Sequence, residues 1–240
     1  MTDIHTHILY DIDDGAKDVD TSVKMLDMEI SDGVDTVVLT PHFDPAKQNI
    51  EEFIIRRDTR ATQLKNAFTG KISIVCGAEV VASPFIADTN NLDLLCIEGT
   101  KCILIELPAS NFLIWIEDMV YKLQLAGYTP ILAHIERYKE LRDLKLLKRL
   151  CDMGCITQIT ASLFDAPGFS DKRFIKKAAA LGLIHTIGSD CHSVSWRPPC
   201  LSRGLQNAQK LISSDFSKKL IFTTDSVVKK GALPYDSFII

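Results

Sequence analysis

Five of the six histidines in this chain lie at or just after short apolar runs that are typical of β-strands; they are His5, His7, His42, His134 and His192. Imidazole is the commonest metal-binding side chain, and it also exchanges protons near neutral pH. One histidine in such a position is more often a core or surface residue than a ligand. Five at the same end of successive strands indicate a shared chemical site.

Carboxylates follow the same predicted strands, and four of them share this position: Asp14, Glu79, Glu106 and Asp190. Glu106 is the most informative of these, because the apolar run 102–105 leads directly into it. Burying a carboxylate there is costly unless it is paired or binds a cation. A solvent-exposed charge at the end of a strand accounts well for one such residue and poorly for four.

These side chains together predict a polynuclear metal centre. His5 and His7 are two residues apart on a strand, so both side chains point to the same side and can bind one ion. Imidazole and carboxylate donors suit manganese, iron, zinc or cobalt more than calcium or magnesium. The nine candidate ligands exceed the needs of one ion and could support two or three. The pocket would then be positively charged, and a phosphate ester is the obvious anion to fill it.

Two arginines strengthen the case for phosphate. Arg137 lies three residues after His134, and Arg197 lies five residues after His192. A planar guanidinium group matches the oxygen atoms of phosphate, although an ordinary surface arginine explains either residue equally well when it is taken singly. The sixth histidine, His185, lies within a predicted strand and is expected to pack there, outside the site.

The elements that must position these residues alternate between short β-branched runs and longer helical periods. Strands are predicted at 3–8, 34–40, 72–78, 102–107, 129–133, 156–160 and 184–188. Helices are predicted at about 18–32, 50–68, 111–126, 138–153, 171–181 and 201–213. A left-handed residue is expected just past four of these helices, at Gly33, Gly127, Gly154 and Gly182.

This alternation predicts an α/β fold with a parallel sheet covered by helices. Seven nearly continuous apolar strands favour a closed or nearly closed barrel, and a doubly wound open sheet is the alternative. In a β/α barrel the carboxyl ends of the strands meet on one face, where the histidines and carboxylates would converge. Residues 1–240 contain no linker or repeat and are expected to form a single domain, with a final helix and a tail within 216–240.

The composition excludes several classes of protein. A hydrophobic fraction of 46% with 24% charged residues excludes disordered and fibrous chains. The net charge of −4 argues against a nucleic-acid partner. No apolar run is long enough for membrane insertion, and residues 1–3 are unlike a signal peptide, so a cytoplasmic location is expected. The seven cysteines are irregularly spaced and are expected to be reduced thiols.

Five short motifs in combination resemble the PHP (polymerase and histidinol phosphatase) superfamily. They are Asp-x-His-x-His at 3–7, Thr-Pro-His at 40–42, Gly-Ala-Glu at 77–79, Ala-His-Ile-Glu-Arg-Tyr at 133–138 and Ser-Asp-x-His at 189–192. The opening stretch 3–15 and the Trp-Arg-Pro-Pro stretch at 196–199 are most similar to the bacterial protein-tyrosine phosphatases of capsule and exopolysaccharide synthesis. The likeness runs from residue 3 to about 212, and the segment after about 215 departs from the usual pattern.

The resemblance implies a distorted TIM-like (β/α)7 barrel with three metal ions, most often manganese. One ion would be held by His5, His7, Glu79 and Asp190, and Glu79 would bridge to a second ion held with Glu106 and His134. The third ion would be held by Asp14, His42 and His192. Arg137 and Arg197 would bind phosphate, and Asp14, His42 or His192 would lie near the leaving oxygen. The implied partner is an autophosphorylated bacterial tyrosine kinase, and the oligomeric state stays open.

Four other interpretations compete with this one. A small-molecule phosphomonoesterase, such as a histidinol-phosphate hydrolase, would use the same scaffold and chemistry. A non-catalytic metal-binding regulator would keep the ligands without turnover, and an amidohydrolase-type deaminase would need a lysine or histidines in place of Glu79 and Glu106. Finally, Cys191 and Arg197 match the C-x5-R pattern of cysteine-dependent tyrosine phosphatases. That loop lacks the expected glycines and continues into Pro198, which has no N–H group for phosphate.

Overall fold

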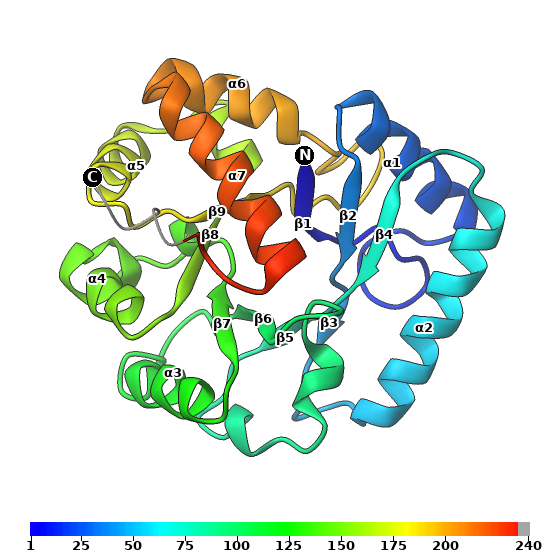
Figure 1. Ribbon diagram of the computed structural model, residues 1–240, viewed down its shortest axis with the longest axis horizontal. Coiled ribbons are helices and arrows are strands. Elements are labelled where there is room, and N and C mark those ends of the chain that lie inside the picture. The colour runs from blue at the N-terminus through cyan, green and yellow to red at the C-terminus, as the bar shows by residue number, and fades with distance from the viewer. Residues whose placement is uncertain (235–240) are drawn as a thin grey trace.

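The computed structural model describes residues 1–234, in which parallel strands are surrounded by helices (Figure 1). In chain order the strands are β1 (Thr2–Thr6), β2 (Thr36–Leu39), β3 (His42–Phe43), β4 (Ser73–Cys76), β5 (Glu79–Val81), β6 (Cys102–Glu106), β7 (Thr129–Leu132), β8 (Ile156–Thr160) and β9 (Thr186–Gly188). All of the predicted strand positions are therefore present, and β3 and β5 are additional short pieces.

The two additional pieces arise because two strand positions are interrupted. β2 continues into β3 past Pro41, and β4 continues into β5 past Gly77. β2 pairs with β4, and β3 pairs with β5, so the two interruptions lie side by side. Pro41 has no N–H group to donate to a neighbouring strand, and its carbonyl oxygen accepts from the backbone N–H of Glu79 at 3.1 Å. The paired pieces count as two positions, which gives the seven of the sequence prediction.

The strands form two hydrogen-bonded groups, in the orders β1-β2-β4 and β3-β5-β6-β7-β8-β9. The groups meet where the end of β1 runs beside the segment that follows β9. There the backbone N–H of Asp190 donates to the carbonyl of His5 at 2.8 Å, and the N–H of His7 donates to the carbonyl of Cys191 at 2.9 Å. The result is a distorted (β/α)7 barrel, as the family resemblance implies.

Helices cover the outside of the barrel. They are α1 (Val19–Ser31), α2 (Ile50–Ala67), α3 (Ile116–Leu125), α4 (Leu144–Asp152), α5 (Phe169–Ala180), α6 (Leu201–Leu211) and α7 (Ser214–Lys230). Several begin at a side chain that accepts a backbone N–H from the first turn, which satisfies a donor that the helix leaves free. Asp18, Asn49, Asp143 and Ser213 cap α1, α2, α4 and α7 in this way. None of the helices among residues 1–234 is long and apolar enough to span a membrane.

Two helices begin later than predicted. The helix expected over 111–126 begins at Ile116, after a turn that buries Phe112 completely. The helix expected over 138–153 begins at Leu144, because Asp143 caps it and a short 3-10 turn, Glu140–Arg142, precedes it. The left-handed glycines are confirmed, with φ angles of 85°, 84°, 92° and 67° at positions 33, 127, 154 and 182. The final helix expected within 216–240 is α7, while the tail at 235–240 lies outside the described residues.

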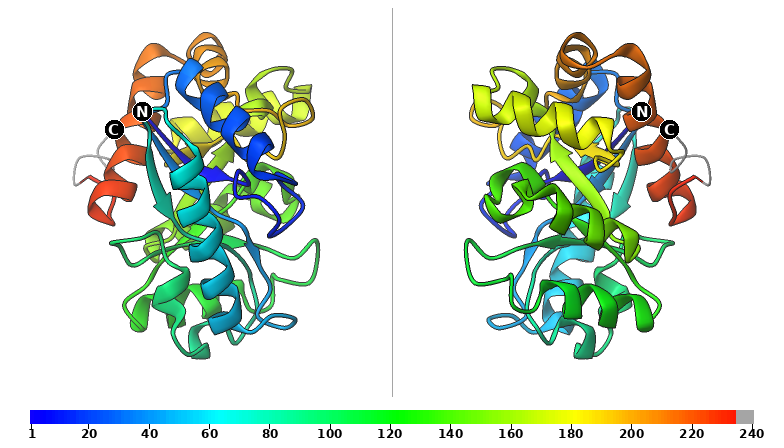
Figure 2. Two further views of the ribbon diagram at one scale, coloured as in Figure 1. Left: turned by 90° about the vertical axis from the view of Figure 1, so that its right-hand side faces the viewer. Right: turned by 90° about the vertical axis from the view of Figure 1, so that its left-hand side faces the viewer.

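The two ends of the barrel differ, because one is closed by a helix over apolar side chains and the other opens toward loops. α7 packs against β1 and β9, and its Val227 joins a fully apolar cluster with side chains from several strands, including Ile4, Leu104, Ile131 and Ile156. In Figure 2, α7 lies on one side of the molecule, and the loops that follow β1, β6 and β9 lie on the opposite side. The carboxyl ends of the strands open toward these loops, so α7 closes the amino end of the barrel.

Candidate metal centre

The first group of ligands contains two imidazoles and two carboxylates at the junction of β1, β5 and the loop after β9. The Nε2 atoms of His5 and His7 are 3.2 Å apart. Glu79 Oε2 lies 3.2 Å from His5 Nε2 and 3.3 Å from His7 Nε2, and Asp190 Oδ1 lies 3.5 Å and 3.4 Å from the same atoms. All four side chains are buried. His5, His7 and Asp190 have the composition and spacing of an ion-binding set, and Glu79 lies beside both imidazoles.

A second group forms around the other side of Glu79. His134 Nε2 lies 2.9 Å from Glu79 Oε1 and 3.6 Å from Glu106 Oε1. His42 Nδ1 lies 3.1 Å from Glu79 Oε2 and 3.7 Å from Glu106 Oε2. Glu79 therefore stands between the two groups, as a bridging carboxylate would.

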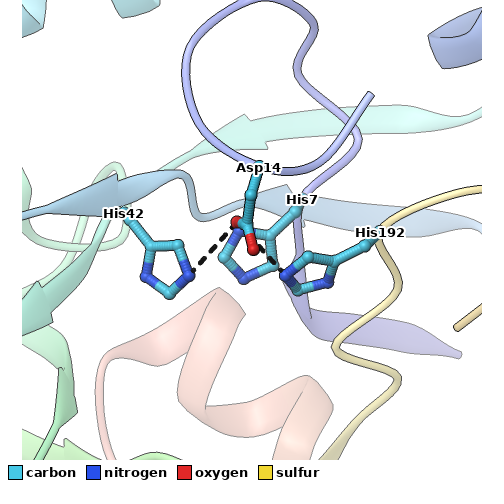
Figure 3. A group of neighbouring side chains, drawn as sticks. All are labelled: His7, Asp14, His42 and His192. Carbon is cyan, nitrogen blue, oxygen red and sulfur yellow. Dashed lines mark ion pairs between the residues drawn. The ribbon is translucent and has the colours of Figure 1, made fainter. Parts of the chain in front are cut away.

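The third group lies nearest to solvent and is drawn in Figure 3. Asp14 Oδ1 lies 3.6 Å from His42 Nε2 and 3.5 Å from His192 Nε2, and His7 completes the set. The ligand atoms of the four residues lie within 4.8 Å of one another. The Asp14 side chain is 64% exposed, whereas His7 and His192 are almost completely buried. Asp14 therefore marks the open mouth of the site.

All nine sequence-predicted ligands thus lie together in one connected cluster. The grouping differs in detail from the one that the family resemblance implies. His7 contacts both the first and the third group, and His42 contacts both the second and the third. Which ion each residue binds stays a prediction, because neighbouring groups share ligands.

The hydrogen bonds of the imidazole rings fit a metal centre. His5, His7, His134 and His192 each point Nε2 into the cluster while Nδ1 faces a separate partner. These partners are Gln158 Oε1 at 3.3 Å, Asp13 Oδ2 at 2.8 Å, the Tyr138 hydroxyl at 3.3 Å and the carbonyl of Asp190 at 3.0 Å, respectively. In metal sites the second ring nitrogen is held in this way, which fixes the ring and leaves the other nitrogen free for the ion.

Two further observations show that a cation fits among these donors. The facing Nε2 atoms of His5 and His7 repel each other if both carry lone pairs, and both cannot carry protons at 3.2 Å. Glu79 Oε2 is buried and makes no hydrogen bond, although three imidazole nitrogens lie within 3.3 Å of it. A divalent ion between these atoms satisfies both, so the side chains present fit the predicted metals.

The shifted pKa values of the ligand side chains show how their charges balance when no ion is bound. Burial disfavours a charge on His5, but Glu79 and Asp190 outweigh it and raise the pKa of His5. Burial likewise opposes ionisation of Glu79, yet His5 and His134 hold the pKa of Glu79 well below its usual value. Burial raises the pKa of Glu106 to about 7, and the neighbouring Glu79 adds to this. His5 and the buried carboxylates Glu79 and Asp190 therefore stabilise each other's charged forms, and bound metal ions would take over the balancing of the carboxylate charge.

Several supporting residues were not predicted from the sequence. Asp13 accepts hydrogen bonds from His7 Nδ1 and from the backbone N–H of His42, and despite its burial His7 lowers its pKa to about 2. Asp3 accepts the backbone N–H of Ser189, next to Asp190, at 3.0 Å. Both residues belong to segments that the sequence analysis singles out: Asp13 lies in the same acidic loop as Asp14, and Asp3 opens the Asp-x-His-x-His motif. Their role as hydrogen-bond partners of the ligand residues does not follow from their spacing in the sequence alone.

The backbone at the site adopts unusual conformations. Six non-glycine residues in the described part of the chain have positive φ angles, and three of them belong to the site: His134, Asp190 and Arg197, at 33°, 54° and 55°. This region is unfavourable for such residues and is maintained only where the surroundings impose it. The register between β1 and β2 also shifts between Asp3 and Thr6, next to His5. Such irregularities re-aim side chains beside active sites.

The two predicted phosphate-binding arginines both reach the cluster. Arg137 Nη2 and Arg197 Nη2 each donate to Asp190 Oδ2, and Arg197 Nη1 lies 3.2 Å from His192 Nε2. Both guanidinium groups are partly exposed, with 42% and 28% of the side chain accessible. They can therefore meet an anion at the mouth of the site, although their partner here is a carboxylate of the site itself.

The Cys191 thiol is not accessible to a substrate. Its side chain is fully buried, with Sγ 3.6 Å from Glu29 Oε1. Burial raises the pKa of the Cys191 thiol well above its usual value, and the nearby Glu29 and Asp3 carboxylates add to this. A nucleophilic cysteine needs a lowered pKa and access to substrate. The match to the C-x5-R pattern is therefore a coincidence of sequence. His185 also lies outside the cluster, where its Nδ1 accepts the backbone N–H of Thr157 at 3.1 Å.

Comparison with known proteins decides the family. The family model for capsular polysaccharide synthesis, CpsB/CapC, matches residues 1–228. The chain belongs to this family. Tyrosine-protein phosphatase YwqE of Bacillus subtilis is 33% identical over 226 residues, covering 92% of this chain and 87% of that protein. Tyrosine-protein phosphatase CpsB of Streptococcus agalactiae serotype III is 31% identical over 229 residues, covering 91% and 92%.

Solved structures agree with this assignment. A chain from the crystal structures of YwqE from Bacillus subtilis and CpsB from Streptococcus pneumoniae, described as metal-dependent tyrosine phosphatases, matches with a TM-score of 0.82. It is 29% identical, and the match covers 95% of this chain and 94% of that one. A histidinol phosphate phosphatase from Lactococcus lactis matches with a TM-score of 0.58 at 18% identity, covering 88% and 92%. The second match shows a shared fold and nothing further.

Proposed function

We propose that this CpsB/CapC family member is a metal-dependent protein-tyrosine phosphatase that removes phosphate from tyrosine residues of a bacterial tyrosine kinase in capsule or exopolysaccharide synthesis. The observation that carries the proposal is the convergence of five imidazoles and four carboxylates at one end of the barrel, with two arginines beside them. The family match and the names of the relatives supply the substrate class.

The chain's own residues would bind and orient the phosphate group. Arg137 and Arg197 would turn from Asp190 to the non-bridging oxygens, whose charge they would balance as the ester bond breaks. Asp14 and His42, the two most exposed of the proposed ligands, would stand with His192 beside the leaving tyrosyl oxygen, where one of the three could supply a proton. Glu79 would hold the two buried groups of ligands in one place.

The metal content is the second part of the proposal. The three overlapping groups of ligands support three divalent ions, and manganese is the first candidate, with iron, zinc or cobalt as alternatives. When bound, the ions would stabilise the negative charge of the phosphate group and acidify a water molecule as the nucleophile. The four imidazoles whose Nδ1 atoms are held would offer Nε2 as neutral ligands.

Further expectations concern the setting of the enzyme. We propose that residues 1–240 form a single catalytic domain that acts in the cytoplasm, with a phosphotyrosyl protein as its partner. The family match over residues 1–228 supports one domain. The net charge of −4 supports a protein rather than a nucleic acid as the substrate.

The test combines metal analysis with turnover. The purified protein is assayed on a phosphotyrosyl peptide before chelation, after chelation, and after manganese is added back. We expect activity to disappear with the metals and to return with manganese. His134→Ala serves as a matched variant, because it removes a ligand of the second group while Tyr138 and Glu79 stay in place. Full activity after complete removal of metals contradicts the proposal.

One alternative shares the same chemistry: a phosphatase for small phosphomonoesters. The fold match to a histidinol phosphate phosphatase keeps it in consideration. The assay above separates the two when histidinol phosphate is measured beside the phosphotyrosyl peptide. A kcat/KM that is much higher for histidinol phosphate favours the alternative.

A further inference from the structure

The loop after β9 is a tightly closed turn that places two neighbouring side chains at the mouth of the site. The backbone N–H of His192 donates to the carbonyl of Arg197 at 2.8 Å, which closes the turn. Within it, Ser193 Oγ accepts from the N–H groups of Ser195 at 3.3 Å and Trp196 at 2.8 Å. One hydrogen bond thus joins the two ends of the segment 192–197, and the Ser193 hydroxyl ties its middle together.

The last two side chains of this turn, Trp196 and Arg197, point in opposite directions. Arg197 takes up a left-handed conformation with φ at 55° and points inward, where it donates to Asp190. Trp196 points outward and is 66% exposed. The two side chains still touch, because the Arg197 guanidinium carbon lies 5.5 Å from the centre of the Trp196 ring.

Trp196 also borders the metal centre directly. Its ring meets the His192 ring edge-on, with 6.3 Å between the centres and an interplanar angle of 82°. His192 in turn lies 3.5 Å from Asp14, the most exposed of the proposed ligands. Other large apolar side chains are exposed in the described part of the chain, among them Val194 of the same turn and Phe222 of α7, but the ring of Trp196 is the one that contacts both His192 and Arg197. An exposed indole at the mouth offers apolar area, and covering this area with an apolar group of a ligand is favourable.

The chemistry of the proposed substrate supplies such a group. When the phosphate of a phosphotyrosine lies between the ions and Arg197, its phenyl ring is one oxygen atom away and must lie at the mouth. The Trp196 ring stands at the mouth, beside both His192 and Arg197. Pairs of aromatic rings gain about 0.5–1.5 kcal/mol beyond the burial of their area.

We propose that Trp196 packs against the phenyl ring of the substrate and thereby sets a preference for aryl over alkyl phosphomonoesters. The inference rests on the proposed phosphatase function and adds a specificity residue to it. Trp196 is prepositioned by the closed turn, so the substrate does not have to order it on binding.

The experiment measures binding of two phosphonates that cannot be hydrolysed, benzylphosphonate and propylphosphonate, by calorimetry on the manganese-loaded protein. Both offer the same anion to the ions and to Arg197, and only the first carries a phenyl ring. We expect the wild-type protein to bind benzylphosphonate about 2- to 12-fold more tightly, the range that follows from one aromatic pair. Trp196→Ala should abolish this preference and leave propylphosphonate binding within about twofold. Trp196→Phe should retain most of it.

Phe222→Ala is the matched control, because it removes an aromatic ring of similar exposure, 61%, from α7 at the closed end of the barrel. It should behave as the wild-type protein. The inference is overturned if Trp196→Ala keeps the preference, if both phosphonates lose affinity equally, or if the wild-type protein has no preference. A protein that binds the phosphonates but hydrolyses no phosphotyrosyl peptide refutes the proposed function instead, and the ratio of the two affinities still decides the role of Trp196.

Discussion

The two ends of the barrel use the same strands for opposite purposes. At the amino end, Leu104 and Ile156 meet Val227 of α7 in a cluster of apolar side chains alone. At the carboxyl end, β6 finishes at Glu106 among imidazoles and carboxylates. Apolar packing stabilises the folded chain, whereas gathering like charges and left-handed backbone costs stability. Apolar clusters such as the one at the amino end thus offset the cost of the strained polar cluster at the carboxyl end.

The first test of this contrast is Glu79→Gln. The carboxylate stands between two groups of ligands, so we expect kcat/KM to fall by roughly 1,000-fold or more, the upper range for losing one electrostatic stabiliser. Metal content should fall with it, while near-ultraviolet circular dichroism of the chelated protein stays that of the wild type. Glu98→Gln, an exposed carboxylate away from the cluster, is the control. Unchanged metal content and turnover would show that Glu79 bridges nothing.

The opposite effect is expected at the amino end, from Ile156→Ala. Ile156 is 2% exposed and belongs to the cluster beneath α7. Truncating a buried isoleucine lowers the free energy of unfolding by about 2–5 kcal/mol. Urea denaturation measures this loss, and kcat per folded molecule should stay within about threefold. A large loss of kcat in the folded variant contradicts the separation of the two ends.

Arg137→Gln separates two roles of this arginine. If it binds phosphate, kcat/KM falls by about 10- to 100-fold, as for the loss of one hydrogen bond to a charged group, and the metals stay bound. If its main role is to hold Asp190, to which it donates in this structure, metals are lost as well. Metal analysis of the same sample that is assayed distinguishes these outcomes, and we expect the first.

The sixth histidine gives a smaller effect that depends on pH. Burial lowers the pKa of His185 to about 4, and Lys219 adds to this. The unfolded chain, with a pKa near 6.5, therefore binds a proton at a higher pH than the folded chain does. Stability from this group is complete above about pH 6.5 and falls by about 1.4 kcal/mol for each pH unit below it, down to about pH 4. Denaturation of the metal-free protein at about pH 7 and pH 5.5 should show this loss.

The corresponding variant is His185→Gln, which lacks the titrating ring. The difference in its free energy of unfolding between the two pH values should be smaller than that of the wild type by about 1 kcal/mol. Equal differences in both proteins would show that His185 does not contribute to the acid sensitivity.

The smallest effect is expected for Cys191→Ser. The thiol is buried against Glu29 and touches none of the proposed ligand side chains. Turnover per bound metal should stay within about threefold, although the hydroxyl is a more polar group to bury. A variant that binds its metals but has no activity would restore thiol catalysis as an explanation.

Most of the polar cluster at the carboxyl end could be predicted from the sequence, because its residues follow a rule of topology. Residues at the ends of parallel strands converge whatever their separation along the chain, so His5 could be placed near His134 and Asp190 without coordinates. The breaks at Pro41 and Gly77 could not be predicted, since they depend on how two neighbouring strands pair with each other. The roles of Gln158 and Tyr138 also depend on contacts between elements, because neither residue type indicates that it will orient an imidazole.

The closure of β1 on the segment after β9 has a consequence for biosynthesis. His5 and His7 on β1 leave the ribosome long before the residues that face them, Asp190 and His192, which follow β9. A nascent polypeptide therefore has no complete metal centre, and metal binding must wait until the two distant segments meet. Phosphatase activity is thereby withheld from every truncated product that stops before the ninth strand.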